Sequence, residues 1–180
     1  MEDLIMHLYV NEKCGHDCRL CCNKFYKVEE IPIPSIEELK KVSTICLTGG
    51  DPFASPHISD FVRLIRKQYK GKKIYAYTSG MFLKLDLDID FPIIDGITIS
   101  PKTEEEFKKV VNDIRVYGEK YFRSGCILNR FIVFKEFTKL LGDDETKILQ
   151  DNNFEILGRT WDSTFKTPEN EIFRRLPILI

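Results

Sequence analysis

Short apolar runs rich in strand-forming residues alternate along this chain with segments whose apolar residues recur at helical spacing. We expect strands at residues 4–10, 42–48, 73–78, 94–100, 125–134 and 154–157, and helices at 35–41, 56–70, 103–117 and 143–150. Such alternation predicts βαβ units, whose right-handed crossovers align parallel strands in one sheet. About six units are too few to close an eight-stranded barrel, so we predict an α/β fold, a partial (βα)6 barrel with mainly parallel strands.

Two segments depart from this pattern. Residues 80–95 alternate leucine or isoleucine with lysine or aspartate but hold few strong strand formers, so we expect them to be irregular. The tail, residues 159–180, is too apolar for a free linker, and we expect it to pack over the open edge of the sheet or against a partner. A chain of 180 residues is expected to form one domain spanning residues 1–180.

The charge balance excludes a global attraction to nucleic acid or anionic lipid, because the formal net charge is only -1 at pH 7. Neither a membrane-spanning apolar stretch nor a secretory signal is visible, so we expect a cytoplasmic protein. Thiols stay reduced in that compartment, and the six cysteines therefore indicate metal ligation or burial rather than disulfides. Burial is expected for Cys46 and Cys126, whereas Cys22 fits either burial or a redox-active role.

A C-x3-C-x2-C run, formed by Cys14, Cys18 and Cys21, follows the first expected strand. Three thiolates at this spacing can bind three irons of a cuboidal iron–sulfur cluster, which leaves one iron open to another ligand. The alternative is a structural zinc site, which needs four ligands. His16 or Cys22 would have to serve as the fourth, and both are cramped against the other ligands in sequence.

A second loop, with the sequence Gly-Gly-Asp-Pro at residues 49–52, follows the second expected strand. Glycines let a backbone approach a ligand closely, and carbonyls at a strand end can accept hydrogen bonds from an ammonium group. An ordinary turn is the alternative for this sequence. Ser79, Ser100 and Lys102 follow the next two expected strands, so all these loops fall at the carboxyl ends of the strands, where α/β folds bind ligands.

The cysteine run and residues 48–52 together resemble the cluster motif and the GGEP segment of the radical S-adenosylmethionine (SAM) superfamily. The resemblance implies a [4Fe-4S] cluster on Cys14, Cys18 and Cys21, with SAM on the open iron. It also implies an oxidoreductase or activating enzyme that cleaves SAM reductively to a 5′-deoxyadenosyl radical, which abstracts hydrogen from a substrate. A flavodoxin or ferredoxin type of protein would then donate the electron.

The same resemblance implies a set of cofactor contacts at the rim of the barrel. They are Leu20 at the adenine, the segment Thr48, Gly49, Gly50, Asp51 and Pro52 at the amino group, and Ser79, Ser100 and Lys102 at the ribose and carboxylate. Two positions depart from the family pattern, because Asp51 replaces a glutamate and Leu20 replaces an aromatic residue. The sequence does not identify a catalytic residue apart from these ligands.

Two small members of the superfamily offer different substrates. Residues 21–24 and 47–52 resemble the activase of anaerobic ribonucleotide reductase, whose partner is a large glycyl-radical protein. Residues 96–102 resemble 7-carboxy-7-deazaguanine synthase, which acts on a small molecule, although Cys22-Asn23 replaces the Asp-Thr pair used there for magnesium. A non-enzymatic alternative is a zinc-binding interaction module that docks a partner through the basic residues between 63 and 73.

Overall fold

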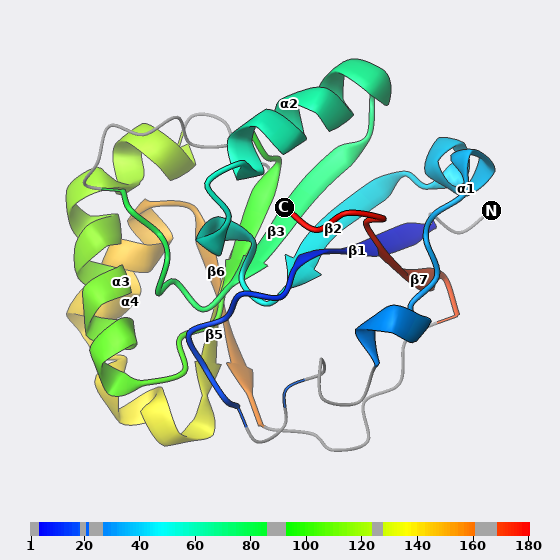
Figure 1. Cartoon of the computed structure of the whole chain (residues 1–180). Coiled ribbons are helices and arrows are strands. Elements are labelled where there is room, and N and C mark those ends of the chain that lie inside the picture. The colour runs from blue at the N-terminus through cyan, green and yellow to red at the C-terminus, as the bar shows by residue number, and fades with distance from the viewer. Residues whose placement is uncertain (1–3, 19–20, 22–26, 86–92, 124–127, 161–168) are drawn as a thin grey trace.

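The computed structural model describes residues 4–18, 21, 27–85, 93–123, 128–160 and 169–180 (Figure 1). Within these residues the chain forms one seven-stranded sheet in the order β6-β5-β4-β3-β2-β1-β7. The strands are β1 (Ile5–Asn11), β2 (Thr44–Gly49), β3 (Lys73–Thr78), β4 (Gly96–Ile99), β5 (Asn129–Phe134), β6 (Phe154–Arg159) and β7 (Glu171–Arg175). Every neighbouring pair is parallel, and the sheet does not close on itself. The predicted α/β class and open, partial-barrel arrangement are therefore confirmed.

The α-helices lie between successive strands, and α1 and α3 begin at side-chain caps. They are α1 (Ile36–Lys41), α2 (Ile58–Gln68), α3 (Glu104–Gly118) and α4 (Asp143–Asp151). Shorter turns form η2 (Val28–Glu30), η3 (Pro52–Ala54), η4 (Glu119–Arg123) and η5 (Lys135–Leu140). Ser35 closes a capping box with Glu38 at the start of α1, and the Thr103 side chain accepts a hydrogen bond from Glu106 N at the start of α3.

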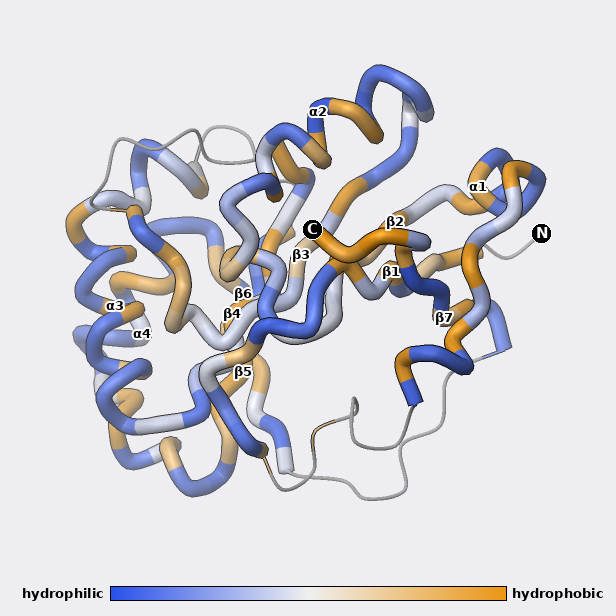
Figure 2. The backbone as a smooth tube through the Cα atoms, in the orientation of Figure 1, coloured by the Kyte–Doolittle hydropathy of each residue, from blue (hydrophilic) through white to orange (hydrophobic). Residues whose placement is uncertain are grey.

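One face of the sheet packs against the helices, and the strand residues on it alternate in sequence as the pleat requires. This core combines apolar residues of α2, α3 and α4 with Met6, Leu8, Val10, Ile45, Leu47, Ile74, Ala76, Ile97, Ile99, Phe131 and Val133. Figure 1 shows α3 and α4 side by side, and Figure 2 shows hydrophobic and hydrophilic residues mixed along α2 and α3, as expected of helices with one buried face. The intervening strand residues point to the opposite face.

Strand β7 was not expected from the sequence. It pairs in parallel with β1, from Ile5 opposite Glu171 to Tyr9 opposite Arg175, and so occupies the edge of the sheet next to β1. Its pattern is weak because only two of its five residues, Ile172 and Phe173, are apolar. A hydrogen bond between His7 and Glu171, with Nε2 and Oε2 2.6 Å apart, adds a side-chain link across this pair.

The remaining sequence expectations are close to the observed elements. Helix α2 is shorter at both ends than the expected 56–70, and the first residues of the expected fifth strand fall in 124–127, outside the described residues. The described parts of segment 80–95 hold no helix or strand before β4, in agreement with the expected irregular structure, yet Leu83, Leu85 and Ile94 are buried in the core. Among the described residues, none of the helices has the length and apolar character needed to span a membrane.

Candidate functional site

The loop after β2 runs against the segment that leads from β1 to the first cysteine. Gly50 N donates to Asn11 O at 2.7 Å, and Asp51 N donates to Lys13 O at 2.7 Å. Asn11 Nδ2 also donates to the Asp51 carbonyl at 2.9 Å, while its buried Oδ1 has no hydrogen-bond partner among the described residues. The two loops that carry the predicted cluster and cofactor residues therefore form one hydrogen-bonded unit with a spare buried acceptor beside it.

The two glycines of this loop are required by contacts within the chain. Gly49 has φ +128°, and a Cβ there would lie 2.4 Å from Asn11 O. A Cβ at Gly50 would lie 2.2 Å from Lys13 O. The sequence suggested that these glycines make room for a ligand, whereas in the structure the missing side chains make room for the backbone that leads to Cys14.

Asp51 is 2% exposed and holds the loop to the end of β3. One carboxylate oxygen accepts a hydrogen bond from Phe53 N at 3.0 Å, which caps η3. The other accepts from Thr78 Oγ1 at 2.6 Å and from Ser79 N at 3.1 Å. Burial raises the pKa of this carboxyl above its usual value, and these hydrogen bonds oppose the shift. Both carboxylate oxygens are thus engaged within the protein.

A second buried carboxylate, Glu106, joins the cysteine loop to the start of α3. Its Oε1 lies 2.5 Å from His16 Nε2, within the segment between Cys14 and Cys18. Its Oε2 accepts a hydrogen bond from Lys102 N at 2.8 Å, and Ser79 Oγ lies 3.4 Å from Oε1. Glu106 therefore holds the loops after β1, β3 and β4 at one position.

The sequence analysis did not single out Glu106, and it considered His16 only as a fourth zinc ligand. The available signal was the Thr103-Glu-Glu-Glu106 sequence, which has the form of a capping box. In the structure only the Thr103 half of the box forms, because the Glu106 carboxylate turns to His16 and to Lys102 N instead. His16 is thereby committed to a carboxylate.

Lys102 brings a positive charge to the cysteines. Its Nζ donates to Ser100 Oγ at 2.7 Å and lies 4.3 Å from the centre of the Phe134 ring, where the ring face attracts a cation. Burial lowers the pKa of the ammonium, and interaction with the negative charge of Cys18 opposes that shift. Lys102 and Ser100, both predicted as cofactor contacts, are therefore side by side at this rim.

The three thiols of the run lie close enough to act on one another electrostatically. Burial is the largest cause that raises the pKa of Cys14 and of Cys18, and the charge of Cys21 raises both further. Cys14 also raises the pKa of Cys18, while Lys102 lowers it. Cys21 N donates to Cys18 O at 3.2 Å, so a turn connects these two cysteines. All three are free thiols rather than disulfides.

Three free thiols on one loop are the kind of donor that an iron–sulfur cluster requires. Throughout the part of the chain that the structure describes, no three His, Cys, Asp or Glu side chains gather as ligands of one metal ion. A cubane takes each thiolate at a different iron, so its ligands stand apart around the cluster rather than around one point. Cys14, Cys18 and Cys21 are the residues that would hold such a cluster, and Lys102 would lie beside it.

The remaining predicted positions are placed as follows. Thr48 is half-buried near the end of β2, and Pro52 is buried at the start of η3. Cys46 is 5% exposed, as expected, and burial raises its pKa to about 12. Leu20, Cys22 and Cys126 lie outside the described residues.

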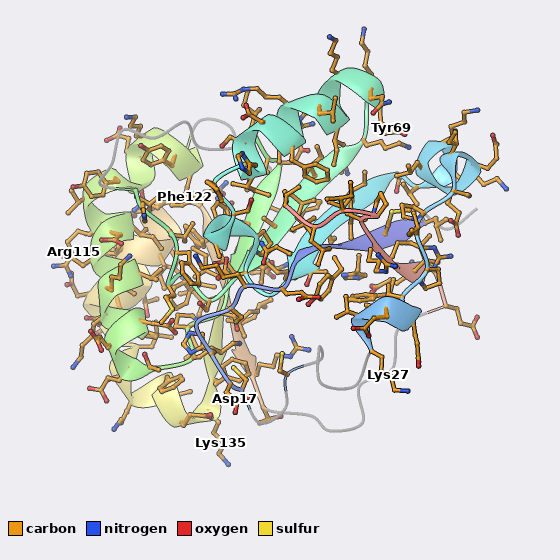
Figure 3. All side chains as sticks on the ribbon, viewed as in Figure 1. Asp17, Lys27, Tyr69, Arg115, Phe122 and Lys135 are labelled. Carbon is orange, nitrogen blue, oxygen red and sulfur yellow. The ribbon has the colours of Figure 1, made fainter. Side chains whose placement is uncertain are left out.

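Figure 3 shows the side of the molecule on which these loops meet. Asp17, within the cysteine run, lies toward the same end as Lys135, which directly follows β5. Tyr69, at the end of α2 and just before β3, lies at the opposite end. The cysteine run is therefore at the carboxyl end of the parallel strands, where the sequence placed it.

Comparisons with known proteins add little to this geometry. No protein-family model and no curated protein sequence matches the chain. A solved structure of BtrN in complex with AdoMet and 2-DOIA aligns with a TM-score of 0.40 and 15% identity, over 88% of this chain and 58% of that one. The chain thus spans less than two thirds of that protein, and similarity at this level carries no information on function.

Proposed function

We propose that this chain is a radical SAM enzyme with a [4Fe-4S] cluster on Cys14, Cys18 and Cys21. The observation that carries the proposal is that the loop with these three thiols follows β1 and is hydrogen-bonded, just before Cys14, to the Gly-Gly-Asp-Pro loop after β2. The loop that contains Asp51 is hydrogen-bonded to the segment that leads to Cys14, so the two motifs form one site. A bound cluster would supply the electron that cleaves SAM to a 5′-deoxyadenosyl radical, with a flavodoxin or ferredoxin type of protein as the electron donor.

The residues of the rim have distinct tasks in this proposal. Lys102 offers a point charge to the methionine carboxylate, and the buried Asn11 Oδ1 offers an acceptor to the amino group together with the backbone of residues 48–50. Ser79 and Ser100 supply hydroxyls to the ribose, and Leu20 supplies apolar contact to the adenine. Asp51 acts by holding the loop in place, because both of its oxygens already accept hydrogen bonds within the protein.

The test is anaerobic purification followed by iron analysis and an assay for 5′-deoxyadenosine with SAM and dithionite. We expect brown protein with about four irons per chain and SAM cleavage. Replacement of Cys14, Cys18 or Cys21 by serine should abolish iron binding and SAM cleavage. The Cys46→Ala variant changes a buried cysteine outside the run and should retain both activities. Colourless protein with about one zinc per chain would contradict the proposal and favour the interaction module.

For the substrate, we propose first the class suggested by residues 21–24 and 47–52, a large glycyl-radical protein. Incubation of the reduced enzyme with SAM and a co-encoded anaerobic reductase should then produce a glycyl radical in electron paramagnetic resonance spectra. Absence of that signal, in a preparation that does cleave SAM, would exclude this class.

A small-molecule substrate is the second class, of the kind suggested by residues 96–102. A specific observation supports it, a cavity of about 400 Å³ in a face of the sheet, lined in part by Tyr77, Thr98 and Arg130. Cavities of roughly 300–1,000 Å³ are the usual size for small-molecule sites. This class predicts turnover without any partner protein.

A further inference from the structure

The cavity lies on the face of the sheet opposite the helices. Tyr77, Thr98 and Arg130 are in register across β3, β4 and β5, so their side chains point the same way from one row. Their sequence neighbours Ala76, Ile97 and Phe131 point into the helix-covered core. Ile132 on β5 and Leu157 on β6 add apolar walls, and Arg159 lines the cavity from the last residue of β6.

The polar groups of this cavity are predominantly donors and cations. Arg130 Nε lies 3.4 Å from Glu155 Oε2 in a solvent-exposed pair, which is a weak interaction at that distance. The side chain of Arg159 is exposed and makes no hydrogen bond or ion pair with any residue that the structure describes. Most of the donors of the two guanidinium groups are therefore available to a ligand.

The positive charge of Arg130 acts on other side chains of this face. Burial raises the pKa of Tyr77 and of Cys46, and the charge of Arg130 opposes that shift. Two guanidinium groups, those of Arg130 and Arg159, line the cavity, and the exposed carboxylate of Glu155 pairs with the first of them.

The cavity is connected to the cysteine loop through Lys102. The charge of Arg159 lowers the pKa of Lys102, which is also influenced by Cys18 and Cys21. Phe134, whose ring lies under the Lys102 ammonium, is paired directly with Arg159 in the sheet. A molecule bound between Arg130 and Arg159 would thus lie beside the predicted cofactor site.

We infer that this cavity binds the carboxylate or phosphate group of a small-molecule substrate, with Arg130 as its anchor and Arg159 at its mouth. The planar guanidinium presents paired donors that match both kinds of oxyanion, and it stays charged at any physiological pH. The Thr98 hydroxyl lies in the same row and can complete the hydrogen bonding, whereas the Tyr77 hydroxyl is hydrogen-bonded to Cys46. The inference rests on the proposed function for the reaction that follows binding, but anion binding itself needs neither cluster nor SAM.

The test measures anion binding by the full chain before and after cluster reconstitution. Pyrophosphate is followed by 31P NMR line broadening and citrate by isothermal titration calorimetry, so the two probes separate the phosphate from the carboxylate preference. We expect Arg130→Gln to weaken binding of the preferred probe about ten- to a hundredfold and Arg159→Gln several-fold, because each removes charge-assisted hydrogen bonds. Arg63→Gln is the matched control, since Arg63 is on α2 and pairs with Asp60. That variant should bind like the wild type.

Each outcome decides one proposal. Equal anion binding by the wild type, Arg159→Gln and Arg63→Gln would overturn the anion site. The test stays valid even if the Arg130 variant fails to fold, because Arg159 is exposed and its replacement should not affect folding. Arginine-dependent anion binding without SAM cleavage would support the anion site and refute the proposed enzyme. SAM cleavage without arginine-dependent anion binding would support the proposed enzyme and refute the anion site. A glycyl radical formed equally well by the wild type and Arg159→Gln would also count against a small anionic substrate.

Discussion

Replacement of Glu106 by alanine tests how the cysteine loop is held. The Glu106 side chain is only 7% exposed and connects three loops through His16 at 2.5 Å, Lys102 N at 2.8 Å and Ser79 Oγ at 3.4 Å. Hydrogen bonds to a charged group contribute about 1.5–3 kcal/mol each, and the two shorter contacts of this carboxylate would be lost together. We therefore expect Glu106→Ala to lower the free energy of unfolding by about 3–5 kcal/mol.

The His16 contact can be isolated by a double-mutant cycle. His16→Ala alone should cost about 1.5–3 kcal/mol, and the coupling between His16→Ala and Glu106→Ala should be of similar size, because the two side chains contact each other directly. Urea denaturation at neutral pH gives the four free energies of unfolding. Glu105→Ala is the control, because Glu105 is on the same turn of α3 but exposed, and it should change stability by less than about 0.5 kcal/mol.

A second measurement shows whether the contact positions the loop. With His16 released, the loop should open more often, so the thiols of Cys14 and Cys18 should react faster with a thiol reagent in both single variants than in Glu105→Ala. A coupling energy below about 0.5 kcal/mol, or unchanged thiol reactivity, would refute the reasoning that Glu106 fixes the cysteine loop.

Two further predictions concern the loop after β2 and the edge of the sheet. Gly50→Ala should destabilise the protein by about 1–3 kcal/mol in urea denaturation, since its Cβ would lie 2.2 Å from Lys13 O, whereas Gly158→Ala, with no atom within 4 Å, should not. Glu38→Gln should cost about 1 kcal/mol at pH 7, after allowance for partial exposure, because hydrogen bonding to Arg174 lowers the pKa of Glu38 from 4.5 to about 2. A lowered carboxyl pKa contributes stability that is present above pH 4.5 and lost toward pH 2, so the difference between wild type and variant should shrink as pH falls through that window. A difference that stays constant from pH 7 to pH 2.5 would contradict this assignment.

Local sequence patterns were sufficient for most of the sheet. Strands β1 to β6 carry enough strand-forming apolar residues to be recognised one at a time, and the helices between most of them favour a parallel arrangement. Strand β7 depends on its partner instead, because Glu171–Arg175 acquires its pairing only when β1 presents an open edge. Such a strand is defined by tertiary context, which a local pattern cannot contain.

The site was predictable to the extent that it is encoded in consecutive residues. The cysteine run and the Gly-Gly-Asp-Pro loop could be found because each is a compact motif, and the topology then brought them together. Glu106 is 90 residues from His16, and its contacts depend on the loops after β1, β3 and β4 meeting. In the sequence it is only one of three consecutive glutamates at a helix start, where an acidic residue is ordinarily favoured by the helix dipole.

The electrostatics of the rim connect these observations. Asp51 and Glu106 are both nearly fully buried, and both oppose ionisation of Cys14, while Lys102 supports ionisation of Cys18. Three thiolates beside two buried carboxylates would be strongly repelled in a medium of low polarity unless positive charge were added. Lys102 supplies such a charge beside the thiols, and the iron cations of the proposed cluster would supply it at the thiols themselves. Without added positive charge, burial and the two carboxylates favour a neutral thiol at Cys14, while the same carboxylates position the loops by hydrogen bonding.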